Sequence, residues 1–271
     1  MESHLLRLKA SDIHWFRFGT GESIVFCFHG YGEQASGYQF LTKFCSNNFS
    51  FISIDLPYHG KTQWEGESPF VLNDLIDIVN AICLAIGRPS SRFSLMGFSL
   101  GGRIALSVFE KLPERIDRMV LLAPDGLKVN FWYWFSTQTI IGNKLFAFTM
   151  KNPQWFFGLL KVINRLGLIN TSIFKFVKYY VHDKPVRELL YARWMVLRKF
   201  TPDIKSIKKQ IATSNTPVRI LYGQHDRIIL SSVGERFRKG IERQCKISII
   251  EAGHQVLHEK HAADIMAALT E

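Results

Sequence analysis

The chain has 271 residues, of which 47% are hydrophobic and 21% are charged, with a formal net charge of +11. This composition is typical of a globular protein and excludes a disordered chain, and the length allows one large core with an inserted subdomain. No run of about 18 apolar residues is present, which excludes a membrane-spanning helix.

Strands and helices alternate in the first part of the chain. Residues 5–18 predict two antiparallel strands, because apolar residues recur there at about every second position and a Gly-Thr-Gly turn follows. The later apolar segments are almost continuously hydrophobic, as strands buried on both faces must be. In chain order we expect a strand at 23–28, a short helix at 38–46, a strand at 49–54, a helix at 72–86 that ends at Gly87, and a strand at 93–96.

The alternation stops in the middle of the chain and then resumes. The expected elements are a helix from residue 103, a strand at 116–122, several helices within 127–212, strands at 218–222 and 247–250, and a helix at 260–269. Strands separated by helices predict right-handed crossovers and a mostly parallel sheet, with ligands at the carboxyl ends of its strands. We therefore expect a core formed by 1–126 and 213–271, and a helical cap formed by 127–212.

The cysteines and the N-terminus indicate the compartment. The N-terminal residues lack the apolar region of a signal peptide. The cysteines are far apart in apolar segments, which favours buried free thiols in a reducing compartment, and their spacing contains no metal-binding pattern. We expect a cytoplasmic protein that needs no metal and no cofactor. These cysteines are Cys27, Cys45, Cys83 and Cys245.

The sequence Gly97-Phe98-Ser99-Leu100-Gly101 is the strongest local signal in the chain. A serine with a glycine two residues before and two residues after it suits a sharp turn from a strand into a helix, because the crowded backbone leaves no room for a Cβ at those positions. Such a turn places the Ser99 hydroxyl at a helix N-terminus, where a developing negative charge is favoured. The pattern predicts a nucleophile.

A serine nucleophile needs a base and an acid that orients the base. Loops that follow predicted strands supply three candidates at His29, Asp226 and His254. Asp125 also follows a strand and competes with Asp226 for the role of the acid, although a Pro-Asp-Gly sequence equally suits a solvated turn. The chain order serine, aspartate, histidine is the one expected of a hydrolase on such a sheet.

Five motifs in this order resemble those of the α/β-hydrolase fold superfamily. They are His29-Gly30, Asp55 to Thr62, Gly97 to Gly101, Gly223 to Asp226, and Gly253-His254. The resemblance implies a mostly parallel eight-stranded sheet flanked by helices, with the helical cap inserted after the sixth strand. Tyr58 and Thr62 stand where that family usually has Gly and Ser, which leaves the subfamily open.

The resemblance also implies roles for single residues. Ser99 would attack a carbonyl carbon, His254 would move the proton, and Asp226 would hold the imidazole and stabilise its cation. The backbone N–H groups of Leu100 and Tyr31 would form the oxyanion hole.

The remaining histidines have simpler interpretations. His29 and His59 are expected to bond to nearby backbone, and His258 and His261 are expected at the surface because they lie on or near a helix.

The segment 127–210 has 15 Lys or Arg, 3 Asp or Glu and 17 of the 36 aromatic residues. One interpretation is that its aromatic side chains pack the cap while its lysines are solvated. The other is a cap that encloses an apolar acyl chain and presents basic residues, such as Lys175 and Lys178, to an anionic membrane surface. Nucleic acid is not expected as a partner, because no binding motif accompanies the charge.

The leading functional hypothesis is a serine hydrolase that cleaves a carboxylic ester or thioester of a small-molecule substrate with an apolar acyl group, through an acyl-enzyme on Ser99. One alternative is a lyase, because Gly101-Gly102-Arg103 is similar to a stretch of the menaquinone-pathway SHCHC synthase in which the family arginine meets an anionic substrate. In that case Arg103 would bind substrate, whereas the simpler interpretation is that it faces outward on its helix. A second alternative is a non-catalytic binding protein with a hydrolase fold.

Overall fold

The computed structural model describes residues 2–44, 48–65, 68–167 and 179–271. The chain divides into two compact units. The first unit consists of the described residues within Met1–Gly66, Phe70–Lys128 and Lys199–Glu271, and the second of those within Glu67–Pro69 and Val129–Arg198. The second unit therefore ends earlier than the expected cap, because the residues after Arg198 pack with the first unit.

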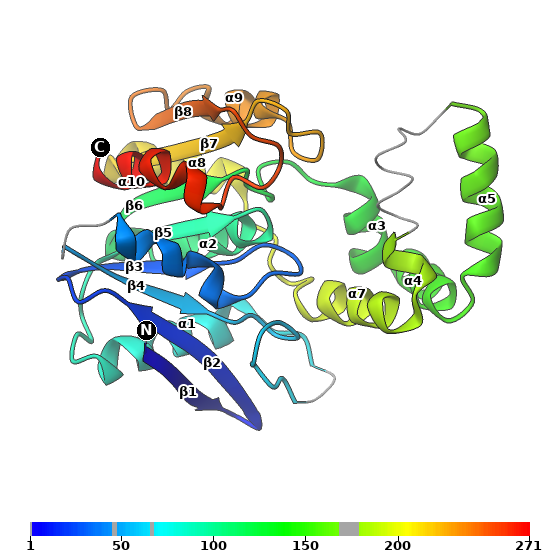
Figure 1. Cartoon of the computed structure of the whole chain (residues 1–271), viewed down its shortest axis with the longest axis horizontal. Coiled ribbons are helices and arrows are strands. Elements are labelled where there is room, and N and C mark those ends of the chain that lie inside the picture. The colour runs from blue at the N-terminus through cyan, green and yellow to red at the C-terminus, as the bar shows by residue number, and fades with distance from the viewer. Residues whose placement is uncertain (1, 45–47, 66–67, 168–178) are drawn as a thin grey trace. The chain divides into compact units, whose positions relative to one another are not determined.

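The first unit is built around an eight-stranded sheet (Figure 1). Its strands lie in the order β1-β2-β4-β3-β5-β6-β7-β8. β1 is antiparallel to β2 and β2 to β4, whereas every other neighbouring pair is parallel. The mostly parallel sheet predicted from the sequence is confirmed. The strands are β1 (Glu2–Leu8), β2 (Ser11–Phe18), β3 (Ser23–Phe28), β4 (Phe49–Ile54), β5 (Phe93–Phe98), β6 (Ile116–Leu122), β7 (Val218–Gly223) and β8 (Cys245–Ile250).

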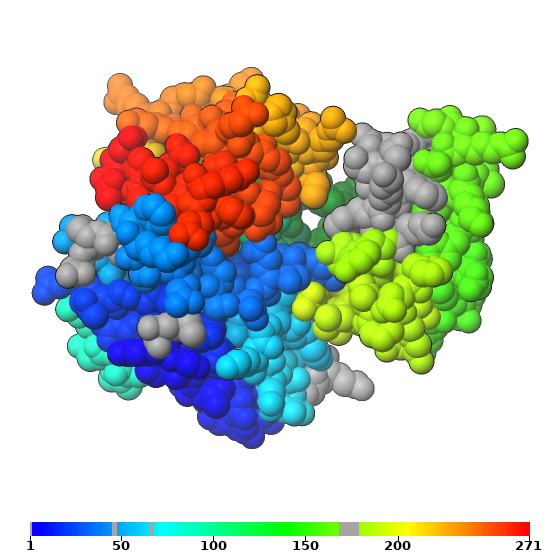
Figure 2. Space-filling model, viewed as in Figure 1, coloured from blue at the N-terminus to red at the C-terminus, as the bar shows by residue number. Residues whose placement is uncertain are grey.

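Helices cover both faces of this sheet. The crossover from β3 to β4 runs in the opposite direction to the later crossovers, and because crossovers are right-handed its helix η1 lies on the other face. The helix α10 contacts both η1 and the strands β6 and β7, and Figure 2 shows its red atoms beside the blue atoms of η1. The helices of the first unit are η1 (Ala35–Lys43), α1 (Leu72–Ala85), α2 (Leu100–Lys111), η2 (Pro113–Arg115), α8 (Ile204–Ser214), α9 (Ser231–Arg238), η3 (Glu259–His261) and α10 (Ala262–Thr270).

Burial explains the composition of the strands. Every residue of β7 is buried, and in β3 and β4 only the first residue is not. β2 differs from its predicted alternation, since six of its eight residues are buried. It lies between β1 and β4, and η1 packs on it, so both of its edges are paired and a helix covers part of it.

The part of the second unit that follows β6 is mostly helical in its described residues, as predicted for the insert. Phe146 is one centre of its packing, with ring centroids 5.2 Å from Tyr191 and 5.3 Å from Trp194. The helix expected at 174–181 falls largely outside the described residues, as do Lys175 and Lys178. The helices of this unit with defined bounds are α3 (Phe131–Gln138), α4 (Ile140–Lys151), α5 (Gln154–Arg165) and α7 (Lys184–Val196).

Candidate active site

Ser99 occupies the turn between β5 and α2. Its φ of 50° is in the left-handed region, which costs a non-glycine residue about 1–3 kcal/mol. A Cβ on Gly97 would lie 2.3 Å from the carbonyl oxygen of Gly101, and a Cβ on Gly101 would lie 1.8 Å from that of Phe28. Both glycines are therefore required by close backbone approach, as the motif predicted.

Backbone hydrogen bonds hold this strained turn. The Ser99 N–H donates to the Leu122 carbonyl at 2.9 Å, and the Ser99 carbonyl accepts from Gly102 and Asp125, each at 2.9 Å. The turn is thereby anchored to the end of β6 and to the loop that follows it. The hydroxyl stands at the N-terminus of α2, where unpaired N–H groups and the helix dipole favour negative charge.

The structure brings Ser99, His254 and Asp226 together. The His254 Nε2 atom lies 3.0 Å from Ser99 Oγ, and its Nδ1 atom lies 2.8 Å from Asp226 Oδ2. A carboxylate can only accept, so the Nδ1–H donates to Asp226 and Nε2 is left to accept the hydroxyl proton of Ser99. This arrangement can remove a proton from the serine.

Asp226 is held in its ionised form. Its Oδ1 atom accepts the N–H groups of Ile228 at 2.7 Å and Ile229 at 3.0 Å, while Oδ2 accepts from His254. Burial opposes ionisation, but the hydrogen bonds from His254, Ile229 and Ile228 outweigh it and lower the pKa of the Asp226 carboxyl. The carboxylate is therefore charged at neutral pH and can stabilise an imidazolium at His254.

Asp125, the competing acid, has a different partner. Its carboxylate forms an ion pair with Arg103, and its backbone contacts the Ser99 turn. Arg103 is only 7% exposed, so the interpretation that it faces outward is wrong. It turns inward because the carboxylate compensates its buried charge. Substrate binding by Arg103 stays a prediction.

The loop after β3 approaches the serine turn. A Cβ on Gly30 would lie 2.8 Å from the ring of Phe98 and 3.5 Å from the Cβ of Ser99. Tyr31 follows Gly30 in this loop and Leu100 follows Ser99 in α2, so the two expected oxyanion donors belong to segments in close contact. The role of their N–H groups stays a prediction.

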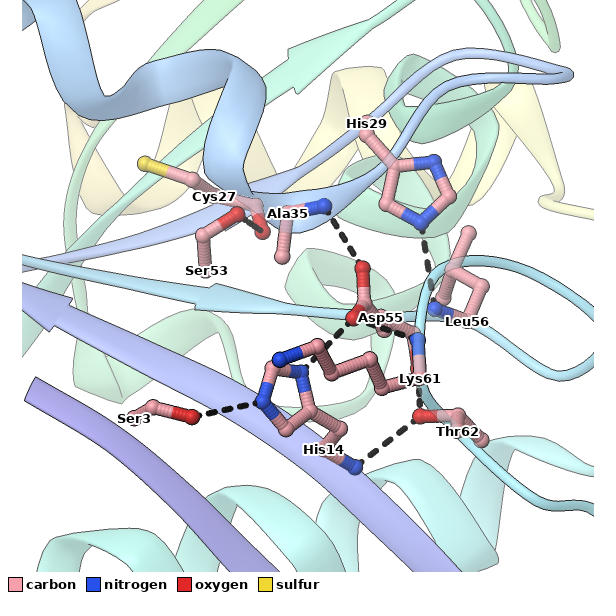
Figure 3. Close-up of polar contacts among 10 residues, drawn as sticks. All are labelled: Ser3, His14, Cys27, His29, Ala35, Ser53, Asp55, Leu56, Lys61 and Thr62. Atoms are coloured by element: carbon pink, nitrogen blue, oxygen red, sulfur yellow. Dashed lines mark hydrogen bonds and ion pairs between the residues drawn. The ribbon is translucent and has the colours of Figure 1, made fainter.

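The buried carboxylate of Asp55 connects the segment that follows β3 to neighbouring parts of the fold (Figure 3). Asp55 Oδ1 accepts the N–H of Ala35 at 2.7 Å, and Oδ2 accepts the N–H of Lys61 at 3.0 Å and the Nδ1–H of His14 at 2.8 Å. The other ring nitrogen of His14, Nε2, lies 2.8 Å from the hydroxyl oxygen of Ser3. Asp55 thus ties the start of η1 to the turn after β4 and to β2.

His29 also connects the loop after β3 to the turn after β4. Its Nε2 atom accepts the N–H of Leu56 at 3.1 Å, so Nδ1 carries the proton and donates to the Gly30 carbonyl at 2.8 Å. His59 bonds to the Pro57 carbonyl at 2.9 Å. Both histidines bond to nearby backbone, as expected from the sequence.

One histidine lies elsewhere than predicted, and one histidine–aspartate pair was not predicted. His261 is buried rather than at the surface, and burial lowers the pKa of its imidazole. The pairing of His14 with Asp55 was not predicted. The only hint of this pair in the sequence is that Asp55 directly follows a buried strand. Nothing in the sequence around His14 indicates a partner.

Replacing Asp55 with asparagine should destabilise the fold. One of three buried N–H donors would face an amide NH₂ instead of a carboxylate oxygen, which we expect to lower the free energy of unfolding by about 3 kcal/mol. Urea denaturation followed by circular dichroism measures the loss. Asp12→Asn is the control, because Asp12 pairs with Arg7 at the surface and should change stability by less than about 1 kcal/mol. Equal losses in the two variants would contradict the supporting role of Asp55.

One known protein family matches most of the chain. Residues 20–261 match the family described as serine aminopeptidase, S33. The chain belongs to this family. It is therefore a hydrolase with the α/β-hydrolase fold, related to esterases and lipases, as the five motifs predicted.

Three relatives of this S33 family member have low sequence identity to it but align with it over most of their length. The Bacillus subtilis hydrolase YugF is 23% identical over 259 residues, which cover 91% of this chain and 90% of that protein. A pimeloyl-[acyl-carrier protein] methyl ester esterase from Nitrosomonas europaea is 23% identical over 254 residues, or 90% of this chain and 93% of the esterase. The solved structure of a thermophilic esterase from Thermogutta terrifontis is similar with a TM-score of 0.67 at 16% identity, over 98% of this chain and 96% of that chain.

Proposed function

We propose that this protein hydrolyses a carboxylic ester or thioester with an apolar acyl group, through an acyl-enzyme on Ser99. The observation that carries the proposal is the hydrogen-bonded series Ser99, His254 and Asp226, with separations of 3.0 and 2.8 Å. It stands at the carboxyl ends of the parallel strands β5, β7 and β8, where ligands bind in open α/β folds.

Acylation follows from the positions of these atoms. Ser99 Oγ attacks the carbonyl carbon while His254 Nε2 takes the hydroxyl proton, and the carbonyl oxygen becomes an oxyanion. The N–H groups of Leu100 and Tyr31 receive that oxyanion, and the N-terminus of α2 adds favourable potential. His254 then gives its proton to the leaving alcohol or thiol.

Deacylation repeats the sequence with water. His254 Nε2 removes a proton from water, the hydroxide attacks the acyl carbon, and Ser99 leaves with the proton that His254 returns. The charged Asp226 holds the imidazole in one tautomer through both halves. No metal or cofactor takes part in the proposed reaction.

An ester substrate is favoured over a peptide by the relatives. The Nitrosomonas europaea protein that matches 90% of this chain is named as an esterase of a methyl ester, that of pimeloyl-[acyl-carrier protein]. Esters also have better leaving groups than amides, so their cleavage depends less on protonation of the leaving group by His254.

A panel of substrates tests the proposal. p-Nitrophenyl esters from acetate to dodecanoate, acyl-CoA thioesters of the same lengths, and an aminoacyl p-nitroanilide are compared by kcat/KM. We expect kcat/KM to rise about tenfold or more from acetyl to octanoyl, because each added CH₂ can bury apolar surface. Faster cleavage of the anilide than of every ester would show a peptidase and overturn the proposal.

A further inference from the structure

The second unit exposes an unusual number of large apolar side chains. Among the described residues of the whole chain 20 such side chains are exposed, and 14 of them lie in this smaller unit. Scattered single exposures are normal, but a concentration of this kind marks an interaction surface. The 14 residues are Val129, Phe131, Trp132, Trp134, Ile140, Ile141, Leu145, Phe148, Trp155, Leu159, Val162, Leu166, Tyr179 and Leu189.

The helix α4 is apolar on two faces. One face is buried within the unit, where Phe146 packs on Trp194. The other carries Ile141, Leu145 and Phe148, which are 76%, 42% and 54% exposed. Positions i, i+4 and i+7 lie on one side of a helix. The packing of the unit therefore does not account for this second stripe.

The helix α5 repeats the pattern. Leu160 is its one buried residue, while Trp155, Leu159, Val162 and the following Leu166 are exposed at a spacing of four, three and four residues. Figure 2 shows the bright green atoms of α5 at the surface of the second unit. Both helices thus present a continuous apolar stripe to their surroundings.

Basic side chains accompany the two stripes. The segment 129–198 has ten Lys or Arg against two Asp or Glu. Within the described part of this segment, Lys184 lies 3.8 Å from Glu188, and basic residues outnumber acidic ones. The exposed basic residues on α4 and α5 are Lys144, Lys151, Lys161 and Arg165.

We propose that α4 and α5 form a docking surface for a lipid bilayer with anionic headgroups. Apolar stripes flanked by lysine and arginine are the composition of helices that lie in a membrane interface, where the charged heads reach the phosphates and the apolar faces enter the acyl boundary. Three tryptophans, the residue most typical of that interface, are exposed in this unit. None of the described helices is long and apolar enough to span a bilayer, so the contact is peripheral.

An acidic protein partner fits these observations less well. A partner held by charge alone would need the lysines but would leave the apolar stripes of both helices unused. A bilayer uses both features at once. The inference does not depend on the proposed reaction, since docking needs none of the residues around Ser99.

Vesicle sedimentation of the full chain tests this surface. The protein is mixed with phosphatidylcholine vesicles with and without phosphatidylglycerol, at low and at high salt. We expect binding to be stronger with phosphatidylglycerol and to weaken as salt shortens the Debye length to about 3 Å near 1 M. A chain that sediments with neither vesicle type would overturn the proposal.

A double lysine variant and a matched control test whether the basic residues of α4 contact the bilayer. Lys144→Gln with Lys151→Gln should lower the partition coefficient on anionic vesicles about 25-fold, because each basic residue near the surface contributes roughly fivefold. Lys205→Gln with Lys209→Gln, on α8 of the first unit, should leave it unchanged. Equal effects of both pairs would refute docking through α4.

The apolar stripe is tested in the same way. Ile141→Asn should lower binding to both vesicle types by about tenfold, whereas Leu84→Asn, at a similarly exposed position of α1, should not. Turnover of a short soluble ester and circular dichroism report folding for each variant. If Ile141→Asn does not fold, the lysine pair decides the matter alone. A folded Ile141→Asn variant that binds like the wild type would overturn the proposal.

Discussion

Replacing Ser99 with alanine should lower kcat for ester hydrolysis by about 10⁶-fold, the largest effect we expect from any single change. In the proposed reaction the Ser99 hydroxyl forms the acyl-enzyme, and its oxygen is 3.0 Å from Nε2 of His254. The fold should remain intact, because the turn is held by backbone hydrogen bonds that alanine keeps. Stopped-flow detection of the released p-nitrophenol measures both the burst and the steady rate.

The control for this change is Ser107→Ala. Ser107 is a buried serine of α2, the helix that begins directly after Ser99. Its hydroxyl donates to the Arg103 carbonyl at 3.0 Å. It should keep kcat within about tenfold, since that bond contributes only about 1 kcal/mol to stability. Retention of the wild-type rate by Ser99→Ala would show that the nucleophile lies elsewhere.

The second large effect is expected for Asp226→Asn, which should lower kcat by roughly 10⁴-fold. An amide NH₂ would face His254 Nδ1 and favour the tautomer that carries its proton on Nε2, where the base must accept one. The variant also lacks a carboxylate whose pKa is lowered in the fold. The wild-type carboxylate stabilises the fold above the pKa of the unfolded state, near 4, and this contribution is lost as pH falls through the lower folded value.

Asp125→Asn separates the two candidate acids. Asp125 pairs with Arg103 and does not contact His254, so the substitution should weaken stability but change kcat of the folded enzyme by less than about tenfold. Steady-state rates and urea denaturation are measured for both variants. A greater loss of kcat from Asp125→Asn than from Asp226→Asn would contradict the assignment of the acid.

Much of the fold could be predicted because its signals are local. The buried strands read as continuous apolar runs since parallel strands are covered on both faces, and residues 23–28 and 49–54 match β3 and β4 exactly as numbered. The turn at Ser99 was also predictable, because the backbone contacts that exclude a Cβ at Gly97 and Gly101 demand those residues in any such turn. Neither inference needed a distant part of the chain.

Other features could not be predicted because they depend on partners far away in sequence. His14 and Asp55 are 41 residues apart and meet only because β2 pairs with β4. For Arg103 the sequence left open whether it binds substrate or faces outward, and the pairing with Asp125 from the loop after β6 was not predicted. A charged side chain is buried when a compensating charge is present, and the sequence does not state which residues will be neighbours.

The sequence by itself determined the order of strands and helices, the strained turn at Ser99 and the set of candidate partners, because each follows from short-range backbone geometry and apolar patterning. Only the tertiary structure decided which partners meet. The sheet brings the loops after β5, β7 and β8 to one edge, so that His254 bonds to Asp226 and lies beside Ser99, while Asp125 is turned toward Arg103. Hydrogen bonds and ion pairs act over about 3 Å, and only the folded chain sets distances on that scale.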